Sequence, residues 1–299
     1  MKPAPFSYLR PDSLEEALAA YEQHGDEAKI LAGGQSLIPL LSMRLAAPAM
    51  LIDINRIEEL AYVRTHENGV AFGALARHAR LETDADARRV QPLLSRALQL
   101  VAHPTIRNQG TTVGSIVHAD AAAEMPMVMT LLGGSVTVRS ARGSREIASR
   151  DLFVGPLECS LRTGEIVTEA TVPALAPSTG TAILEISRRH GDYALCGVGA
   201  VVGIDAAGAV ESVRAGFLSV SETPMVLDLS EAFADGDLSA ANLGKAAEIA
   251  MDGIDPEADI HATADYRRHI AGVLTRRVIS AAHADASEPT IAHDQEGAA

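Results

Sequence analysis

The segment Ala32-Gly33-Gly34-Gln35-Ser36 decides how this sequence is interpreted. It lies between two apolar runs, residues 28–31 and residues 37–45, which predict a short strand and a short helix. Adjacent glycines accept positive φ, and successive N–H groups in such a turn form a concavity for anions. Ser36 adds a hydroxyl donor, and the lack of a following Lys-Ser or Lys-Thr pair excludes an ATP-binding P-loop. A tight turn without a ligand is the alternative.

A second polar segment follows a predicted helix at residues 92–102. It reads Ile106-Arg107-Asn108-Gln109-Gly110-Thr111-Thr112-Val113-Gly114-Ser115 and continues to His118-Ala119-Asp120. Its glycines, hydroxyls, arginine and asparagine are groups that suit phosphate and ribityl oxygens. The sequence predicts an irregular segment over residues 103–120, and such long segments inside compact domains are more often functional than idle. A solvated surface loop is the alternative.

The composition narrows the class of protein. A chain of 299 residues allows roughly two domains. A net charge of −14, no Trp and 3% aromatic residues argue against a nucleic-acid binder. The two cysteines, Cys159 and Cys196, cannot supply an iron–sulfur cluster or a disulfide framework. No run approaches the ~18 apolar residues of a membrane helix, and the N-terminus lacks the apolar core of a signal peptide, so we expect a cytoplasmic protein.

The remaining patterns outline two domains. Ser13 and Glu16 form a capping box that begins a helix ending near Gly25. Asn68-Gly69 predicts a hairpin turn, and residues 135–138 and 145–148 predict a second hairpin. Residues 165–173 predict a strand before an aperiodic linker. Beyond the linker we expect strands at residues 182–188, 198–204 and 212–220, then helices at residues 240–251 and 264–282. This order is typical of an α+β module.

Several short motifs occur in an order and spacing that resemble one family. They are Phe6-Ser7-Tyr8 with Pro11, Leu51-Ile52-Asp53-Ile54, Gly73-Ala74-Leu75, His103-Pro104, Ile106-Arg107-Asn108, Arg189-His190-Gly191-Asp192-Tyr193-Ala194 and Tyr266-Arg267-Arg268. Together with the two glycine loops, this series resembles the FAD-binding medium subunit of the molybdenum hydroxylase family, of the carbon monoxide dehydrogenase and xanthine dehydrogenase type. The resemblance covers roughly residues 4–285.

The resemblance implies an α+β fold with a two-lobed FAD-binding domain of the PCMH type, followed by a smaller α+β domain with an antiparallel sheet and helices. We expect the first domain at residues 1–176, with lobes of about 1–57 and 58–176. The second is expected at residues 177–285, and a disordered tail at residues 286–299.

The resemblance also implies the cofactor-binding residues. The first loop and the second loop would hold the FAD diphosphate and ribityl chain, Glu124 would hydrogen-bond the flavin cofactor, the main chain of Val167 would meet the ring edge, and Tyr193 would lie beside the ring. Asp120 is a polar neighbour. The full set is Ala32, Gly33, Gly34, Gln35, Ser36, Thr111, Gly114, Ser115, Asp120, Glu124, Val167 and Tyr193.

The second loop departs from the family pattern at one position. The usual tandem glycine is here Val113-Gly114. A β-branched valine resists positive φ, so the family conformation does not carry over to this loop directly.

The function that the resemblance implies is electron transfer by non-covalently bound FAD. A small subunit with [2Fe–2S] clusters and a large molybdopterin subunit would be partners, in a dimer of heterotrimers, and an external acceptor would take the electrons. No catalytic or metal-binding residue is expected in this chain. Carbon monoxide, an N-heterocycle or an aldehyde remain open as substrates. A stand-alone FAD-dependent oxidoreductase and a non-catalytic nucleotide-binding scaffold are the alternatives.

Three other features of the sequence have no assigned role in cofactor binding. Gly197-Val198-Gly199-Ala200-Val201-Val202-Gly203 lies inside a strand-like run without a following helix, so we interpret its glycines as packing residues and not as a dinucleotide fingerprint. Asp53 at a strand end is interpreted as structural. Arg188 and Arg189 could face a partner, the cofactor or solvent.

Overall fold

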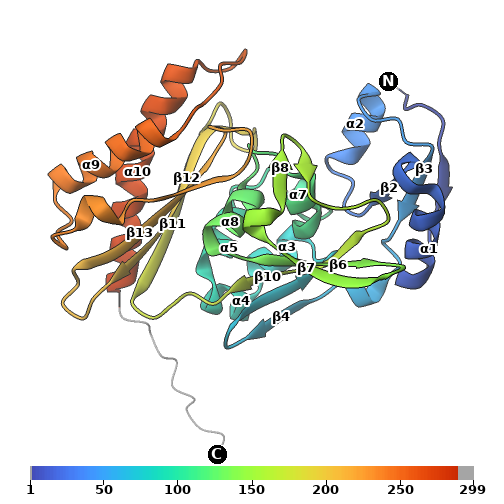
Figure 1. Ribbon diagram of the computed structural model, residues 1–299, viewed down its shortest axis with the longest axis horizontal. Coiled ribbons are helices and arrows are strands. Elements are labelled where there is room, and N and C mark those ends of the chain that lie inside the picture. The colour runs from blue at the N-terminus through green and yellow to red at the C-terminus, as the bar shows by residue number, and fades with distance from the viewer. Residues whose placement is uncertain (1, 289–299) are drawn as a thin grey trace, which may run out of the picture.

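The computed structural model describes residues 2–288, which form three bodies in a row (Figure 1). The N-terminal lobe lies at one end, a middle lobe follows, and the C-terminal module lies at the other end. The α+β fold expected from the sequence is confirmed. The expected tail lies mainly at residues 289–299, outside the described residues, whereas the last helix continues to Ser287.

The N-terminal lobe is a small parallel sheet with two helices. Its strands are β1 (Ser7–Leu9), β2 (Ala28–Leu31) and β3 (Met50–Asp53), in the order β1-β3-β2. Helix α1 (Leu14–His24) begins at Ser13, whose hydroxyl accepts a hydrogen bond from the Glu16 amide at 3.2 Å, as the capping box predicts. Helix α2 (Leu37–Met43) follows the first glycine loop directly.

The middle lobe is an antiparallel sheet covered by short helices. The strand order is β4-β5-β10-β6-β7, where β4 is Val63–His66, β5 Gly69–Gly73, β10 Ile166–Pro173, β6 Ser135–Ser140 and β7 Gly143–Ala148. The helices are α3 (His78–Thr83), α4 (Ala85–Val90), α5 (Pro92–Leu98), α6 (Pro104–Arg107), α7 (Thr112–His118) and α8 (Glu124–Leu132). Strands β8 (Phe153–Gly155) and β9 (Glu158–Cys159) form a small hairpin.

The segment expected to be irregular contains two helices, so that expectation was wrong. Pro104 stands in the first turn of α6, and the Thr111 hydroxyl caps α7 by accepting from the Gly114 amide at 3.2 Å. Helices of four and seven residues are too short to show an apolar period.

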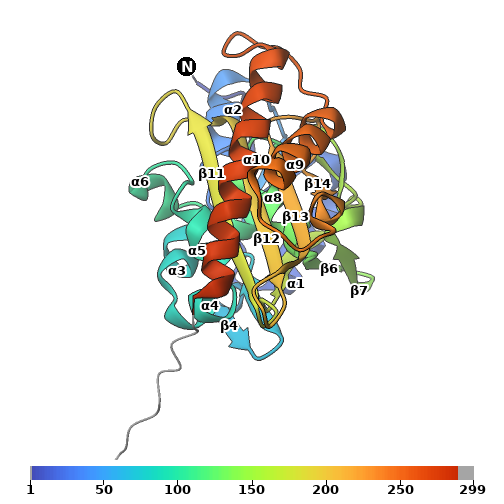
Figure 2. The ribbon, with the colours of Figure 1, turned by 90° about the vertical axis from the view of Figure 1, so that its left-hand side faces the viewer.

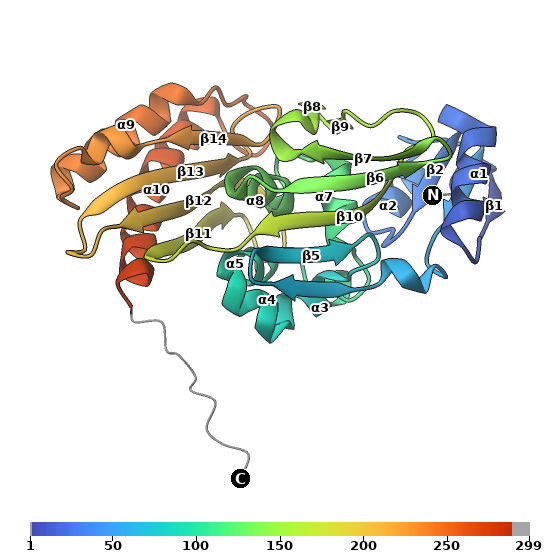
Figure 3. The same ribbon diagram turned by 60° about the horizontal axis from the view of Figure 1, so that its bottom comes forward.

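The C-terminal module is a four-stranded antiparallel sheet in the order β11-β12-β13-β14. Its strands are β11 (Thr179–Ser187), β12 (Ala194–Ile204), β13 (Val210–Leu218) and β14 (Met225–Asp228). Helices α9 (Ala240–Gly253) and α10 (Ala264–Ser287) cover one face (Figure 2). The other face packs on the middle lobe, and Figure 3 shows the strands of both sheets running along the long axis of the molecule.

Glycines on the inner face of this sheet make room for α8. A Cβ at Gly199 would lie 3.1 Å from Met127 Cε, and a Cβ at Gly216 would lie 2.6 Å from Met127 Sδ. Gly199 belongs to the run that resembles a dinucleotide fingerprint, and its position inside β12 agrees with a packing role.

Two cores result from this arrangement. One unites the N-terminal and middle lobes and includes Ala194 and Leu218 from the C-terminal module. The second lies between the C-terminal sheet and α9 with α10. Arg96 of α5 joins the two domains by a short ion pair with Asp285 of α10 and by a 2.8 Å bond to the Thr181 hydroxyl. Within residues 2–288, no helix combines the length and apolar character needed to cross a membrane.

Replacement of Gly180 by alanine should destabilise the C-terminal module. The added Cβ would lie 2.1 Å from the Ala282 carbonyl oxygen and 2.3 Å from the Ala286 amide of α10, which are main-chain atoms that cannot swing away. We expect a loss of about 1–3 kcal/mol in the free energy of unfolding, measured by urea denaturation. Gly244→Ala is the matched control, because nothing lies within 4 Å of its Cβ and a helical alanine should stabilise by up to about 1 kcal/mol. Equal effects of the two substitutions would contradict the close approach of α10 to β11.

Candidate cofactor-binding site

The two glycine loops, which come from different lobes, are in direct contact. A Cβ at Gly33 would lie 2.7 Å from Gly110 Cα, 2.7 Å from the Thr111 amide nitrogen and 2.8 Å from the Gln109 carbonyl oxygen. These atoms leave no room for any side chain at this position. The structure therefore brings together the two loops that the sequence singled out.

A network of polar side chains joins the loops underneath. The Asn55 side-chain amide donates to the Ala32 carbonyl at 2.8 Å and to Asp53 Oδ1 at 2.6 Å. Arg77 donates to Asn55 Oδ1 at 2.6 Å and to the Gln109 carbonyl at 2.5 Å. Asn55 and Arg77 thus connect the main chains of both loops.

Asp53 anchors this network to the N-terminal lobe. It accepts a short hydrogen bond from the Tyr8 hydroxyl, and Arg10 lies 3.7 Å from the same carboxylate oxygen. Desolvation opposes the charge of Asp53, but the hydrogen bonds from Tyr8 and Asn55 outweigh it and lower the pKa of the carboxyl. The structural role predicted for Asp53 agrees with this geometry.

His78 supports the second loop from below. Its amide donates to the Gly110 carbonyl at 3.0 Å, and its Nδ1 lies 3.1 Å from the Thr112 hydroxyl. Burial, with a smaller effect of the Arg107 charge, lowers the pKa of His78 to about 4, so the ring is neutral at physiological pH. A Cβ at Gly110 would lie 2.8 Å from the His78 ring, so this position, which contacts Gly33, has no room for a side chain either.

The first loop presents main-chain donors that the protein itself does not use. No residue in the described part of the chain accepts a hydrogen bond from the amides of Gly33, Gly34, Gln35 or Ser36. Gly34 has a φ of 73°, the left-handed conformation that favours glycine. Unsatisfied backbone donors are costly unless water or a ligand pairs with them, so four consecutive free N–H groups mark an anion-binding concavity.

The second loop is organised by the start of α7. Thr111 is 3% exposed and its hydroxyl is engaged as the helix cap, whereas Gly114 is exposed and Ser115 partly exposed. A Cβ at Gly114 would lie 2.5 Å from the Thr111 hydroxyl oxygen, so this glycine permits the cap. Val113 is helical and 3% exposed in the core. The loop therefore needs no positive φ at Val113, where the family has a glycine.

Tyr193 and two acidic residues gather beside Ser36. Tyr193 lies before β12 and is 61% exposed, but desolvation of its hydroxyl and the charges of Asp120 and Glu124 raise its pKa, and the nearby Ser36 hydroxyl has a smaller opposing effect. The C-terminal module thus contributes Tyr193 to the region of the first loop. Val167 lies in β10 opposite Val138 and is 6% exposed.

Glu185 is a further acidic residue of this region that sequence reasoning missed. It lies on β11 opposite Gly197, and its Oε2 atom is buried without a hydrogen-bond partner among the described residues. Burial, with the charges of Glu185 and Asp120, raises the pKa of Glu124 to about 8, and burial raises the pKa of Glu185 to about 7. The pair therefore retains protons near neutral pH.

Sequence patterns gave only weak signals for the supporting residues. Asn55 stands two positions after the strand-end Asp53, whereas Arg77, His78 and Glu185 come close to the loops only through the tertiary fold.

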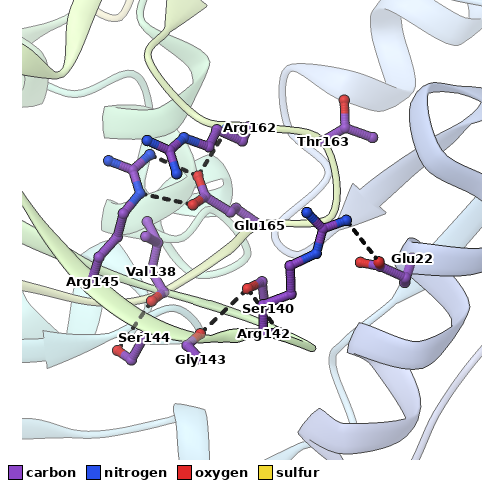
Figure 4. A pocket seen from close by; sticks show the side chains of 10 residues that line it. All are labelled: Glu22, Val138, Ser140, Arg142, Gly143, Ser144, Arg145, Arg162, Thr163 and Glu165. Atoms are coloured by element: carbon purple, nitrogen blue, oxygen red, sulfur yellow. Dashed lines mark hydrogen bonds and ion pairs between the residues drawn. The ribbon is translucent and has the colours of Figure 1, made fainter.

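Two of the cavities formed by the described residues differ in their relation to the loops. One, of about 230 Å³, lies between the tip of the β6–β7 hairpin and α1 (Figure 4). Two of its three arginines are paired within it, since Arg145 binds Glu165 at 2.7 Å and Arg142 binds Glu22 at 3.2 Å, and it contains none of the predicted site residues. The other, of about 680 Å³, is lined in part by Asp120 and Tyr193 and flanks the site. The described residues contain no group of three or more side chains suited to hold a metal ion.

Comparisons with known proteins cover nearly the whole chain. Residues 4–175 match the family described as FAD binding domain in molybdopterin dehydrogenase, and residues 182–282 match the CO dehydrogenase flavoprotein C-terminal domain. The chain is 41% identical to the 6-hydroxypseudooxynicotine dehydrogenase complex subunit alpha of Paenarthrobacter nicotinovorans, over 94% of this chain and 96% of that protein. It is 33% identical to the carbon monoxide dehydrogenase medium chain of Hydrogenophaga pseudoflava, over 95% and 99%.

Solved structures of related enzymes show the same fold. The structure of the Hydrogenophaga pseudoflava carbon monoxide dehydrogenase superimposes with a TM-score of 0.89 at 33% identity, covering 95% of this chain and 99% of that chain. Quinoline 2-oxidoreductase from Pseudomonas putida 86 gives a TM-score of 0.88 at 34% identity, covering 96% and 100%.

The pH dependence of stability should change when Glu185 is replaced by glutamine. Because both carboxyls have pKa values raised above the ordinary 4.5, the folded chain binds more protons than the unfolded chain between about pH 4.5 and 8. The contribution of the pair to stability is therefore greatest at the acid end of this window and falls as the pH rises through it. Urea denaturation at about pH 5 and at about pH 9 measures how much the free energy of unfolding falls between the two. Glu185→Gln should make this fall smaller by on the order of 1 kcal/mol.

Glu211→Gln is the control, because Glu211 is exposed on β13. An unchanged pH dependence in Glu185→Gln would show that the carboxyl of Glu185 is not held in its protonated form.

Proposed function

Because this chain belongs to the family of FAD-binding medium subunits of molybdenum hydroxylases, we propose that it holds FAD non-covalently across the two glycine loops and transfers electrons within a larger complex. The observation that carries this proposal is the contact between the loops, together with the four free N–H groups of the first loop. The chain would pass electrons from [2Fe–2S] clusters of a partner to an external acceptor.

The residues of the site fit a dinucleotide diphosphate. The free amides of residues 33–36 and the Ser36 hydroxyl are hydrogen-bond donors, as an anion requires. Gly114 and Ser115 would face the diphosphate and ribityl chain from the second loop, and Thr111 would act mainly by capping α7. When bound, FAD accepts electrons singly or in pairs and releases them in either way, so the chain need only bind and orient it.

The other end of the site would receive the flavin ring. We place Tyr193 beside the ring and the main chain of Val167 at its edge. Glu124 would donate a hydrogen bond from a protonated carboxyl, since burial and the neighbouring charges raise its pKa to about 8. Asp120 would be a polar neighbour of Glu124 and Tyr193.

The proposed partner subunits are inferred from the relatives, which are subunits of larger enzymes. Medium chains of carbon monoxide dehydrogenase and nicotine 6-hydroxylase are subunits of multi-chain enzymes, and this chain covers almost their entire length. Cys159 and Cys196 both have pKa values raised to about 12 by burial, the opposite of cluster-binding thiolates. We propose a small iron–sulfur subunit and a large molybdopterin subunit as partners, in a dimer of heterotrimers located in the cytoplasm. The large subunit would determine the substrate.

We also propose the domain division expected from the sequence, at residues 176 and 177, with lobes meeting near residue 57. The two separate hydrophobic cores support it, because the C-terminal sheet and its helices share a core of their own. A stand-alone oxidoreductase and a nucleotide-binding scaffold are not favoured, since the relatives of similar length are subunits of dehydrogenases.

Replacement of both Gly33 and Gly34 by valine should abolish flavin retention. A side chain at Gly33 would separate the loops, and one at Gly34 would strain a φ of 73° and obstruct the donors. Flavin content is measured from the absorbance of the purified chain.

Gly34→Ala alone should weaken FAD binding by about tenfold while keeping the fold, because its Cβ would contact only the Ile38 and Leu31 side chains, each at 3.2 Å.

Gly199→Ala is the control for a glycine outside the loops. Its Cβ would lie 3.1 Å from the flexible end of Met127, and FAD content should not change. Stoichiometric FAD in the folded double-valine variant would show that the diphosphate does not lie on the first loop.

A further inference from the structure

The smaller cavity gathers basic side chains that the proposed FAD site does not use. Three arginines line it, Arg142 and Arg145 from the β6–β7 hairpin and Arg162 from the segment before β10 (Figure 4). The carboxylates of Glu22 and Glu165 share the lining, so its side chains leave an excess of one positive charge. In a chain with a net charge of −14, such a local excess provides a favourable place for an anion.

Glu165 fixes one wall of this cavity. Its side chain is 8% exposed and accepts from Arg145 Nε at 2.7 Å and from Arg145 Nη2 at 2.8 Å. It also accepts from the Arg162 amide at 2.8 Å. The bonds from Arg145 are the main cause that lowers the pKa of Glu165, so its carboxylate stays ionised. Glu165 therefore neutralises Arg145 and holds the main chain of Arg162 at the wall.

Two donors beside Glu165 have no acceptor in the described part of the chain. The Arg162 guanidinium forms no hydrogen bond or ion pair within residues 2–288, although its main chain is held. The Thr163 amide also has no acceptor there, whereas the Thr163 hydroxyl donates to Asp26 at 2.6 Å. A guanidinium is a planar fork of N–H donors whose geometry matches the oxygens of a phosphate group. Arg162 and the neighbouring amide thus offer donors that an oxyanion could use.

The third arginine is held only by a solvent-exposed ion pair. Arg142 has a side chain that is 85% exposed, and it binds Glu22 of α1, which is 41% exposed, at 3.2 Å. An exposed pair of this kind contributes little to stability, so Arg142 can exchange Glu22 for a bound anion at little cost. Because Glu22 belongs to the N-terminal lobe and Arg142 to the middle lobe, the exchange would take place where the two lobes meet.

The size of the cavity limits the ligand. Its volume of about 230 Å³ is below the roughly 300–1,000 Å³ of pockets that hold drug-sized molecules. We propose that this cavity binds a phosphate-type oxyanion, held by Arg162, Arg142 and the Thr163 amide. Free inorganic phosphate and the phosphate of a nucleotide share this chemistry, and the volume favours the free anion. The cavity contains no residue of the proposed FAD site, so this inference goes beyond the proposed function and does not depend on it.

Calorimetric titration of the FAD-loaded full chain with inorganic phosphate, at an ionic strength held constant with potassium chloride, tests the proposal. Bound FAD keeps phosphate away from the first glycine loop, so saturable binding of phosphate is expected at the cavity alone. Arg162→Gln should weaken phosphate binding by about tenfold or more, because it removes the charged donor that has no other partner. Arg150→Gln is the matched control and should leave binding unchanged, since Arg150 is 84% exposed, pairs with Asp151 and does not line the cavity.

A second variant should act in the opposite direction. Glu22→Gln removes the carboxylate that competes for Arg142, so it should strengthen phosphate binding several-fold, which a loss of folding could not do. Adenosine monophosphate should bind more weakly than inorganic phosphate, and tighter binding of adenosine monophosphate would support the oxyanion site while making a nucleotide its source.

Equal phosphate affinity of the wild-type chain and Arg162→Gln, or no saturable binding by the FAD-loaded chain, would overturn the proposal. A wild-type chain that purifies without FAD contradicts the proposed function instead. The difference in phosphate affinity between that chain and Arg162→Gln would still test the cavity, because Arg162 lies outside both glycine loops.

Discussion

The contact between Gly33 and the second loop is the constraint on which the rest of the site depends. Two main chains from different lobes approach so closely that a single Cβ would lie 2.7 Å from atoms of Gly110 and Thr111. This close contact brings polar backbone groups together. It is stabilised because Asn55 binds the Ala32 carbonyl of the first loop, Arg77 binds the Gln109 carbonyl of the second, and the two side chains bind each other. The lobes are therefore joined by hydrogen bonds at the place where a cofactor diphosphate would bridge them.

Helix α8 couples this site to the C-terminal module. Its buried face packs through Met127 into the space left by Gly199 and Gly216, while its first residue, Glu124, lies among the groups of the site. The same module supplies Tyr193, which lies near Ser36 of the N-terminal lobe. Three bodies thus bring residues to the candidate site, and the packing of α8 against β12, β13 and β14 fixes the C-terminal module relative to the middle lobe.

The sequence was most informative where local pattern and tertiary role coincide. Helix α1 has the expected bounds, and the loop at residues 32–36 lies between the predicted strand and helix, because capping boxes, apolar periodicity and glycine pairs are local signals. Helices α6 and α7 were missed since one turn or two of polar residues carry no period. His78 and Glu185 were missed for a different reason. Their roles come from burial beside distant segments, which neither spacing nor composition encodes.

The distribution of charge around the site favours one orientation of the proposed FAD. The free amides of the first loop form the end with positive potential, whereas Asp120, Glu124 and Glu185 form an acidic end beside Tyr193. A diphosphate bound among the carboxyls would meet less favourable electrostatics than one bound at the free amides, so the charges favour the diphosphate at the first loop. The raised pKa values of Glu124 and Glu185 mean that this end keeps protons near neutral pH, which limits its repulsion of a ring that gains electrons. The carboxyls can therefore lie beside an electron-accepting ring without forming a permanent barrier of negative charge.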